Sequence, residues 1–142
     1  PEDEYLVPIG VADVKRSGEQ ISLFSYGLMV HYCLQAAERL ESEGVSVEVV
    51  DLRTVKPLDR HSIVQSVKKT GRALIVHEDN MTNGFGAEIA AKISDIGFEY
   101  LDAPIKRVAS LDCHVAYSPI LEDEILVQTS WIQDAIEELL EY

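Results

Sequence analysis

The run His77-Glu78-Asp79, directly after the apolar stretch 73–76, is the densest group of side chains able to do chemistry. Imidazole and carboxylate groups ligate metals and transfer protons. Successive residues of a strand point to opposite faces of the sheet, so the three side chains do not easily converge on one ion. The carboxyl end of a central strand is, however, where α/β proteins place function. We therefore expect these residues to hold neighbouring loops or a subunit interface.

Two glycine-bearing turns, Ser25-Tyr26-Gly27 and the stretch 82–86 (Thr-Asn-Gly-Phe-Gly), each precede an expected helix. Such a turn can bind phosphate through the free N–H groups of the helix. Neither turn carries the spaced glycines of a dinucleotide fingerprint or the Gly-Lys-Ser/Thr of a P-loop. Structural turns, with Asn83 and Gly84 supplying positive φ angles, are the preferred interpretation.

The remaining chemistry-bearing residues, His31 and the pair Cys113-His114, have no catalytic spacing. The sequence contains no Gly-Asp-Gly motif for magnesium and diphosphate, no nucleophile elbow and no acid–base dyad. We assign no catalytic, cofactor or metal residue, and the chain has the character of a binding or assembly domain.

The charge of the chain is strongly negative, at −13 from 12 basic and 25 acidic residues. This balance disfavours nucleic acid and anionic membranes as partners, since both require clustered Lys and Arg. No Lys or Arg follows Arg107, whereas eight acidic residues do. Most of them are expected to form a solvated face. The dense cluster Glu122-Asp123-Glu124 is the candidate docking surface for a basic partner.

Apolar spacing predicts strands alternating with amphipathic helices over most of the chain. The strands are expected at 21–25, 45–50, 73–76 and 105–109, and the helices at 29–40, 60–69, 87–96, 122–127 and after a cap at Thr129 or Ser130. Residues 1–18 are expected to be an N-terminal linker and residues 19–142 one domain. Alternation of this kind predicts a mostly parallel sheet covered by helices on both faces. No apolar run approaches the roughly 20 residues that a membrane-spanning helix needs.

Six motifs follow one another along the chain: Ser-Tyr-Gly at 25–27, Val-Val-Asp-Leu-Arg-Thr at 49–54, Pro-Leu-Asp at 57–59, His-Glu-Asp at 77–79, Gly-Phe-Gly-Ala-Glu-Ile-Ala at 84–90 and Leu-Asp-Ala-Pro-Ile-Lys-Arg-Val at 101–108. In this order they resemble one known module over essentially the whole chain, the C-terminal domain of the beta subunit of thiamine-diphosphate-dependent 2-oxoacid dehydrogenases. This module is also called the transketolase C-terminal domain. The His-Glu-Asp and Gly-Phe-Gly-Ala-Glu combination looks most like the branched-chain and pyruvate dehydrogenase members. The loop 113–118 and the Thr-Asn-Gly at 82–84 depart from the family pattern.

The resemblance implies a three-layer α/β/α fold with about five strands, and a beta subunit that assembles with an alpha subunit and a second beta subunit. The complete enzyme would oxidatively decarboxylate a 2-oxoacid, branched-chain or pyruvate, and pass the acyl group to lipoyl groups. Thiamine diphosphate and Mg²⁺ would bind outside this domain, which alone would be inactive. Its expected roles are dimer contact and binding of the acyltransferase's basic peripheral subunit-binding domain, in a bacterial cytoplasm or mitochondrial matrix. The low cysteine count, Cys33 and Cys113, suits such a reducing compartment.

Two alternatives remain open on the sequence alone. The chain could be the equivalent domain of a transketolase-type ketol transferase, which acts without lipoyl partners. It could also be a flavodoxin-like module that binds a small anion or nucleotide through residues 25–27 and the loop after residue 76.

Overall fold

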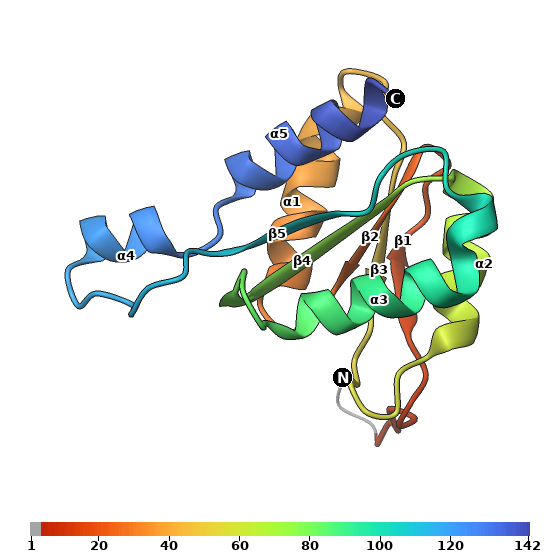
Figure 1. Ribbon diagram of the computed structural model, residues 1–142, viewed down its shortest axis with the longest axis horizontal. Coiled ribbons are helices and arrows are strands. Elements are labelled where there is room, and N and C mark those ends of the chain that lie inside the picture. The colour runs from red at the N-terminus through yellow and green to blue at the C-terminus, as the bar shows by residue number, and fades with distance from the viewer. Residues whose placement is uncertain (1–3) are drawn as a thin grey trace.

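A five-stranded sheet in the order β1-β3-β2-β4-β5 forms the centre of the computed structural model, which describes residues 4–142 (Figure 1). The strands are β1 (Asp13–Arg16), β2 (Ile21–Ser25), β3 (Val47–Asp51), β4 (Ala73–Asn80) and β5 (Lys106–Ser110). Strands β2 to β5 are mutually parallel, and only β1 runs antiparallel, against β3. The expected five-stranded, mostly parallel sheet is confirmed.

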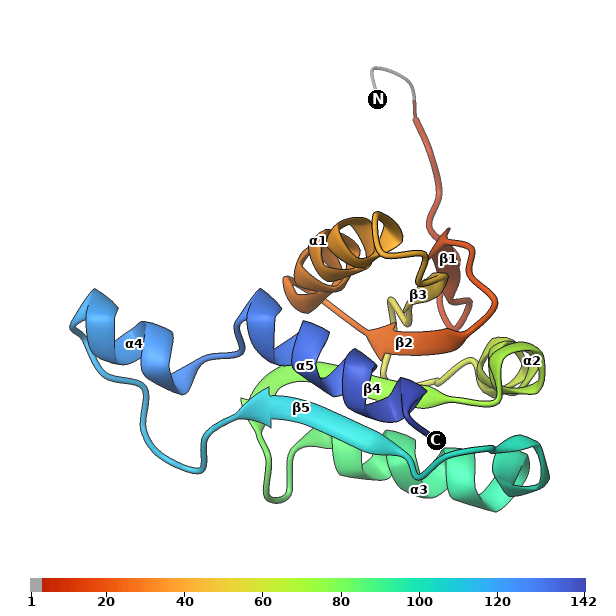
Figure 2. The same ribbon diagram turned by 90° about the horizontal axis from the view of Figure 1, so that it is seen from above.

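Helices cover both faces of this sheet, as the apolar spacing predicts (Figure 2). The helices are α1 (Met29–Glu41), α2 (Arg60–Thr70), α3 (Phe85–Gly97), α4 (Pro119–Ile125) and α5 (Thr129–Leu140), with a 3₁₀ turn at Phe98–Tyr100. Helices α1 and α5 share one apolar core with the sheet, and α2 and α3 share the other. The alternating side chains of β4 feed both cores: Leu74 and Val76 face the first, and Ala73 and Ile75 face the second.

Helix boundaries follow the local sequence signals in most places. Asp59 caps α2 by accepting a hydrogen bond from the backbone N–H of Ser62, and Gly71 ends that helix with a φ of +68°. Helix α5 begins at Thr129 without a side-chain cap, so the expected cap at Thr129 or Ser130 is wrong. Helix α4 begins at Pro119, earlier than expected, because proline suits the first turn of a helix.

The expected linker over residues 1–18 requires a correction, because Asp13–Arg16 forms the edge strand β1. The segment before β1 is also tied to the body: the backbone N–H of Gly10 donates to Thr54 Oγ1 at 3.0 Å, and that of Ala12 donates to Asp59 Oδ2 at 2.9 Å. Residues 1–3 of the expected linker lie outside the described residues.

The loops that the sequence singles out lie at the carboxyl edge of the sheet. Strands β2 and β4 are neighbours in the sheet, but the chain leaves them in opposite directions: from β2 it continues to β3 on one side, and from β4 to β5 on the other. The loops after β2 and β4 therefore point away from each other. Open α/β sheets bind ligands at such a switch point. The residues His77, Glu78 and Asp79 lie there, within an extended β4.

Candidate functional site

His77 is fully buried at this edge and packs against the first turn of α3. A Cβ atom added to Gly86 would lie 2.2 Å from the ring atoms Cδ2 and Nε2, and one added to Gly84 would lie 2.7 Å from Cε1. Neither ring nitrogen has a hydrogen-bond partner among the described residues. Burial lowers the pKa of His77. The nearby carboxylate of Asp79 raises this pKa, and Arg107 lowers it by a smaller amount. The imidazole is therefore a packing group whose burial favours its neutral form.

His77 has no exposed surface among the described residues, and the expectation that it holds neighbouring loops or a subunit interface stays a prediction. Strand alternation directs His77 and Asp79 to the α2/α3 side of the sheet and Glu78 to the α1/α5 side. Glu78 and Asp79 are both exposed. Burial raises the pKa of the Tyr26 phenol, and the charge of Asp79 raises it further by a smaller amount. The three residues thus serve different surroundings, as expected from their strand positions.

Glu78 joins two residues of the C-terminal cluster in a groove of about 240 Å³ beside the N-terminus of α1. We call it the acidic groove. Its lining residues are Leu28, Met29, Tyr32, Glu78, Glu122, Asp123, Leu126, Val127 and Gln128. Glu124 is exposed and does not line it. Of the six candidate residues, the structure therefore brings three together from positions 44 residues apart in the chain.

The electrostatics of the acidic groove suit a cation. The N-terminal end of α1 carries the positive end of the helix dipole, and α1 has no acidic residue in its own first turn. Glu78, Glu122 and Asp123 line the groove together with Leu28 and Met29, which stand at this end of the helix. Leu28 and Tyr32 add an apolar wall. A long alkyl stem with a positive tip, as in Lys or Arg, matches this combination.

The turn Ser25-Tyr26-Gly27 is engaged internally and offers little to an anion. The Ser25 hydroxyl donates to the backbone carbonyl of Val76 at 2.9 Å. The Tyr26 ring meets Phe85 edge-on, with centroids 6.1 Å apart and an interplanar angle of 79°. Gly27 has a φ of +62°, which explains the glycine. The carboxylates of the acidic groove lie beside the neighbouring helix end, so the geometry disfavours phosphate there.

The second glycine-bearing turn is only partly as expected. Asn83 has a φ of +61°, as predicted, but Gly84 has an ordinary φ of −64°. Gly84 is required instead by its close approach to the backbone carbonyl of Asn80 and to His77. This turn is a packing device.

Metal and cofactor chemistry finds no suitable residues in the described part of the chain. Within residues 4–142 no three His, Cys, Asp or Glu side chains are placed to hold a metal ion. Cys33 is buried, which raises the pKa of its thiol to about 12, and Cys113 is exposed; both are free thiols. No contact to thiamine diphosphate or Mg²⁺ is assigned to these residues. No helix of the described residues is long and apolar enough to cross a membrane.

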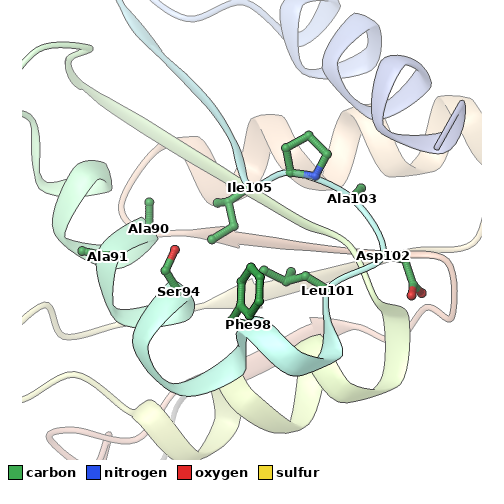
Figure 3. A pocket seen from close by; sticks show the side chains of 9 residues that line it. Ala90, Ala91, Ser94, Phe98, Leu101, Asp102, Ala103 and Ile105 are labelled. Atoms are coloured by element: carbon green, nitrogen blue, oxygen red, sulfur yellow. The ribbon is translucent and has the colours of Figure 1, made fainter.

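A hollow of about 570 Å³ lies between α3 and the loop before β5 (Figure 3). Small and apolar side chains line it: Ala90, Ala91, Ser94, Phe98, Leu101, Ala103, Pro104 and Ile105, with Asp102 at its rim. Asp102 is the one titratable side chain among the lining residues, so no acid–base pair is assembled there.

Comparison with known proteins places the chain in a family. The family model "Transketolase, C-terminal domain" matches residues 10–132. The chain belongs to the transketolase C-terminal domain family. The fold agrees: the solved structure of a split-gene transketolase, described as an inactive beta4 tetramer, superposes with a TM-score of 0.83 at 25% identity, over 95% of this chain and 44% of that chain.

Similar curated proteins are beta subunits of oxidoreductases. The chain is 48% identical to the 2-oxoisovalerate dehydrogenase subunit beta of Bacillus subtilis, over 100% of this chain and 44% of that protein. It is 49% identical to the pyruvate dehydrogenase E1 component subunit beta of the same organism, over 83% and 36%. It is 42% identical to the Bacillus subtilis acetoin:2,6-dichlorophenolindophenol oxidoreductase subunit beta, over 99% and 41%. The chain thus spans less than half the length of these relatives.

Sequence reasoning identified the acidic residues but missed the groove that joins them. The signal was present in part: Glu78 follows a buried strand, and Glu122 and Asp123 follow a Pro that starts a helix. The apolar wall from Leu28 and Tyr32 depends on how the segment 122–128 comes to lie beside the start of α1, which no local pattern indicates.

Proposed function

We propose that this chain is the assembly domain of a 2-oxoacid dehydrogenase beta subunit. The complete enzyme, with its alpha subunit and a second beta subunit, decarboxylates a branched-chain 2-oxoacid or pyruvate oxidatively and passes the acyl group to lipoyl groups. The support is the family match together with the beta-subunit relatives at 42–49% identity. Thiamine diphosphate and Mg²⁺ supply the decarboxylation chemistry when bound elsewhere in the assembly, and this chain alone is inactive. The reducing interior of a bacterial cell or mitochondrion is the proposed location.

The acidic groove is the observation that carries the partner assignment. Glu78, Glu122 and Asp123 surround a hollow with an apolar wall, so a basic side chain of the acyltransferase's peripheral subunit-binding domain fits there. Charge attraction of this kind accelerates association and selects a basic partner over others. It also weakens with salt, because exposed charges are screened over about 10 Å at 0.1 M ionic strength.

Self-association of the chain is the second part of the proposed role. The solved neighbour with the TM-score of 0.83 is described as a beta4 tetramer. A beta chain of this fold can therefore assemble with copies of itself, and we assign the same capacity to this domain.

The test is isothermal titration calorimetry, in which the basic peripheral domain is titrated into the purified chain and the dissociation constant is measured at low and at high salt. The triple variant Glu78→Gln, Glu122→Gln, Asp123→Asn removes the charges of the acidic groove while keeping the side-chain shapes. We expect its dissociation constant to rise about tenfold or more, since each 1.4 kcal/mol lost is a factor of ten.

The matched control neutralises three exposed carboxylates of the C-terminal helix and its end, Asp134→Asn, Glu137→Gln and Glu141→Gln. It makes the same change in net charge, so a general electrostatic effect would weaken both variants equally. An equal loss in the two variants, or binding that ignores salt, would refute the acidic groove as the docking site.

A ketol transferase remains the second candidate, because the superposed neighbour is a split-gene transketolase. Its domain needs no acyltransferase, so a chain that ignores the basic domain in every condition would favour it.

A further inference from the structure

The segment 111–126, which we call the arm, extends away from the body of the domain and carries α4 at its tip (Figures 1 and 2). Its base is closed by a hydrogen bond from the backbone N–H of Leu111 to the carbonyl of Ile125 at 3.0 Å. The next residue, Asp112, accepts from the N–H and hydroxyl of Thr82 at 2.8 and 2.6 Å. The arm is therefore pinned at its root, and its tip lacks a covering layer within the described residues.

The outward surface of the arm is apolar to an unusual degree. The exposed fractions are 104% for Tyr117, 76% for Ile120 and 55% for Leu121. Glu124 lies one helical turn beyond Ile120 and Leu121, so the three share a face of α4. This face differs from the one that sends Glu122 and Asp123 into the acidic groove. Large exposed apolar groups gathered in one place mark an interaction surface.

A second groove, of about 260 Å³, offers the complementary surface on the same chain. It lies between the loop after β3 and the first turns of α3, and Val55, Pro57, Leu58 and Phe85 form its apolar part. Because β3, β4 and β5 are parallel, this groove and the arm both lie at the carboxyl edge of the sheet.

Cations surround this second groove, which we call the basic groove. Lys56, Arg60 and Lys92 line it together with one acid, Glu88. Glu88 pairs with Lys92 at 3.3 Å, and Asp95 lies 3.9 Å from the same lysine, whereas Lys56 and Arg60 have no ion-pair partner among the described residues. In a chain of net charge −13, two cations without ion-pair partners at one apolar groove stand out. They match the charge of Glu124, and the apolar part matches Ile120 and Leu121.

We propose that the arm of one copy inserts α4 into the basic groove of a second copy, and that the second copy returns the same contact. The inference deepens the self-association proposed above and rests on it. A reciprocal contact is closed under twofold symmetry, so it ends at a dimer instead of continuing as a chain. Each arm buries its apolar tip in the basic groove of the other copy, whereas in a single copy the tip is exposed to water.

Sedimentation velocity of the chain at several concentrations measures the dimer constant. The arm variant Glu124→Lys and the groove variant Lys56→Glu, Arg60→Glu should each weaken the dimer about tenfold or more. Combining them places opposite charges together again and should restore the constant to within about threefold of the original. The apolar variant Ile120→Ser should weaken the dimer without charge rescue.

The matched charge controls are Glu141→Lys and Arg39→Glu, which reverse exposed charges away from both surfaces, and a thermal melt confirms that each variant folds. A dimer that persists in Glu124→Lys, an absence of rescue in the combined variant, or a chain that stays monomeric at all concentrations overturns the inference. None of these residues lines the acidic groove. Titration of Glu124→Lys with the basic peripheral domain therefore separates failure of the arm contact from failure of the proposed function.

Discussion

Replacing Gly86 by alanine should lower the free energy of unfolding by about 1–2 kcal/mol, although alanine is the better helix former. The added Cβ atom would lie 2.2 Å from Cδ2 and Nε2 of His77, whose ring is fully buried. Non-bonded carbon atoms pack at about 3.5–4.0 Å, so ring or helix must move by more than about 1 Å. Overpacking of a core costs about 1–3 kcal/mol, which exceeds the gain of up to about 1 kcal/mol from replacing a helical glycine.

Urea unfolding followed by circular dichroism measures this effect, with Gly97→Ala as the control. Gly97 ends the same helix, and a Cβ atom there would meet Val67 and Ile93 at ordinary distances of 3.7 and 3.8 Å. This control should be neutral or more stable by up to about 1 kcal/mol. The double variant with His77→Ala removes the ring that the new methyl group meets. The loss of unfolding free energy caused by Gly86→Ala should therefore be smaller by about 1 kcal/mol or more in the His77→Ala background than in the original chain.

A Gly86→Ala chain as stable as Gly97→Ala, with no coupling to His77, would refute the reasoning. The ring would then not be held between β4 and α3, and the assignment of His77 as a packing residue would have to be withdrawn.

Three further predictions concern stability. Burial lowers the pKa of His77 below its value in the unfolded chain, so the unfolded state binds the proton more readily. The contribution of His77 to the free energy of unfolding should therefore be fully present above about pH 6.5. It should decrease on acidification by at most about 1.4 kcal/mol per pH unit. The difference between urea midpoints of the chain and of His77→Leu, followed from pH 7 to 5, checks this, and parallel curves would contradict it. Lys69→Met should cost about 1–3 kcal/mol in chemical unfolding, because it leaves the buried Glu48 carboxylate without its ion-pair partner; an unchanged midpoint would show that water already serves Glu48. Asp59→Ala should lower the unfolding free energy by about 1–2 kcal/mol through loss of the α2 cap and of the bond to Ala12, whereas Asp59→Asn should retain most of it.

The layers of the fold were predictable because each buried element carries its own periodicity. The residues Met29, Cys33, Ala36, Ala37 and Leu40 recur at helical spacing, and all are buried on one side of α1. Strand β1 was not predictable in this way, since its burial pattern shows no fully buried residue and its pairing with β3 is an edge contact. An edge strand of four residues carries too little apolar signal to be distinguished from an extended linker.

The candidate site was predictable in its residue types and not in its geometry. Strand alternation correctly separates Glu78 from His77 and Asp79, because the direction of each side chain follows from the period of two. The sequence also contains both the histidine and the glycines at 84 and 86 as separate motifs. That the glycines make room for the imidazole ring is visible only once β4 and α3 pack together. Tertiary contacts of this kind lie beyond any local pattern.

Helix α4 connects the two proposed surfaces, and its two faces keep them separable. Glu122 and Asp123 turn toward α1 and line the acidic groove, whereas Ile120, Leu121 and Glu124 face outward. With only seven residues, the helix has too few contacts of its own to fold stably apart from the chain. Its placement depends on the hydrogen bonds at the base of the arm, so loosening that base should impair both surfaces. Substitutions on one face alone should impair only one of them.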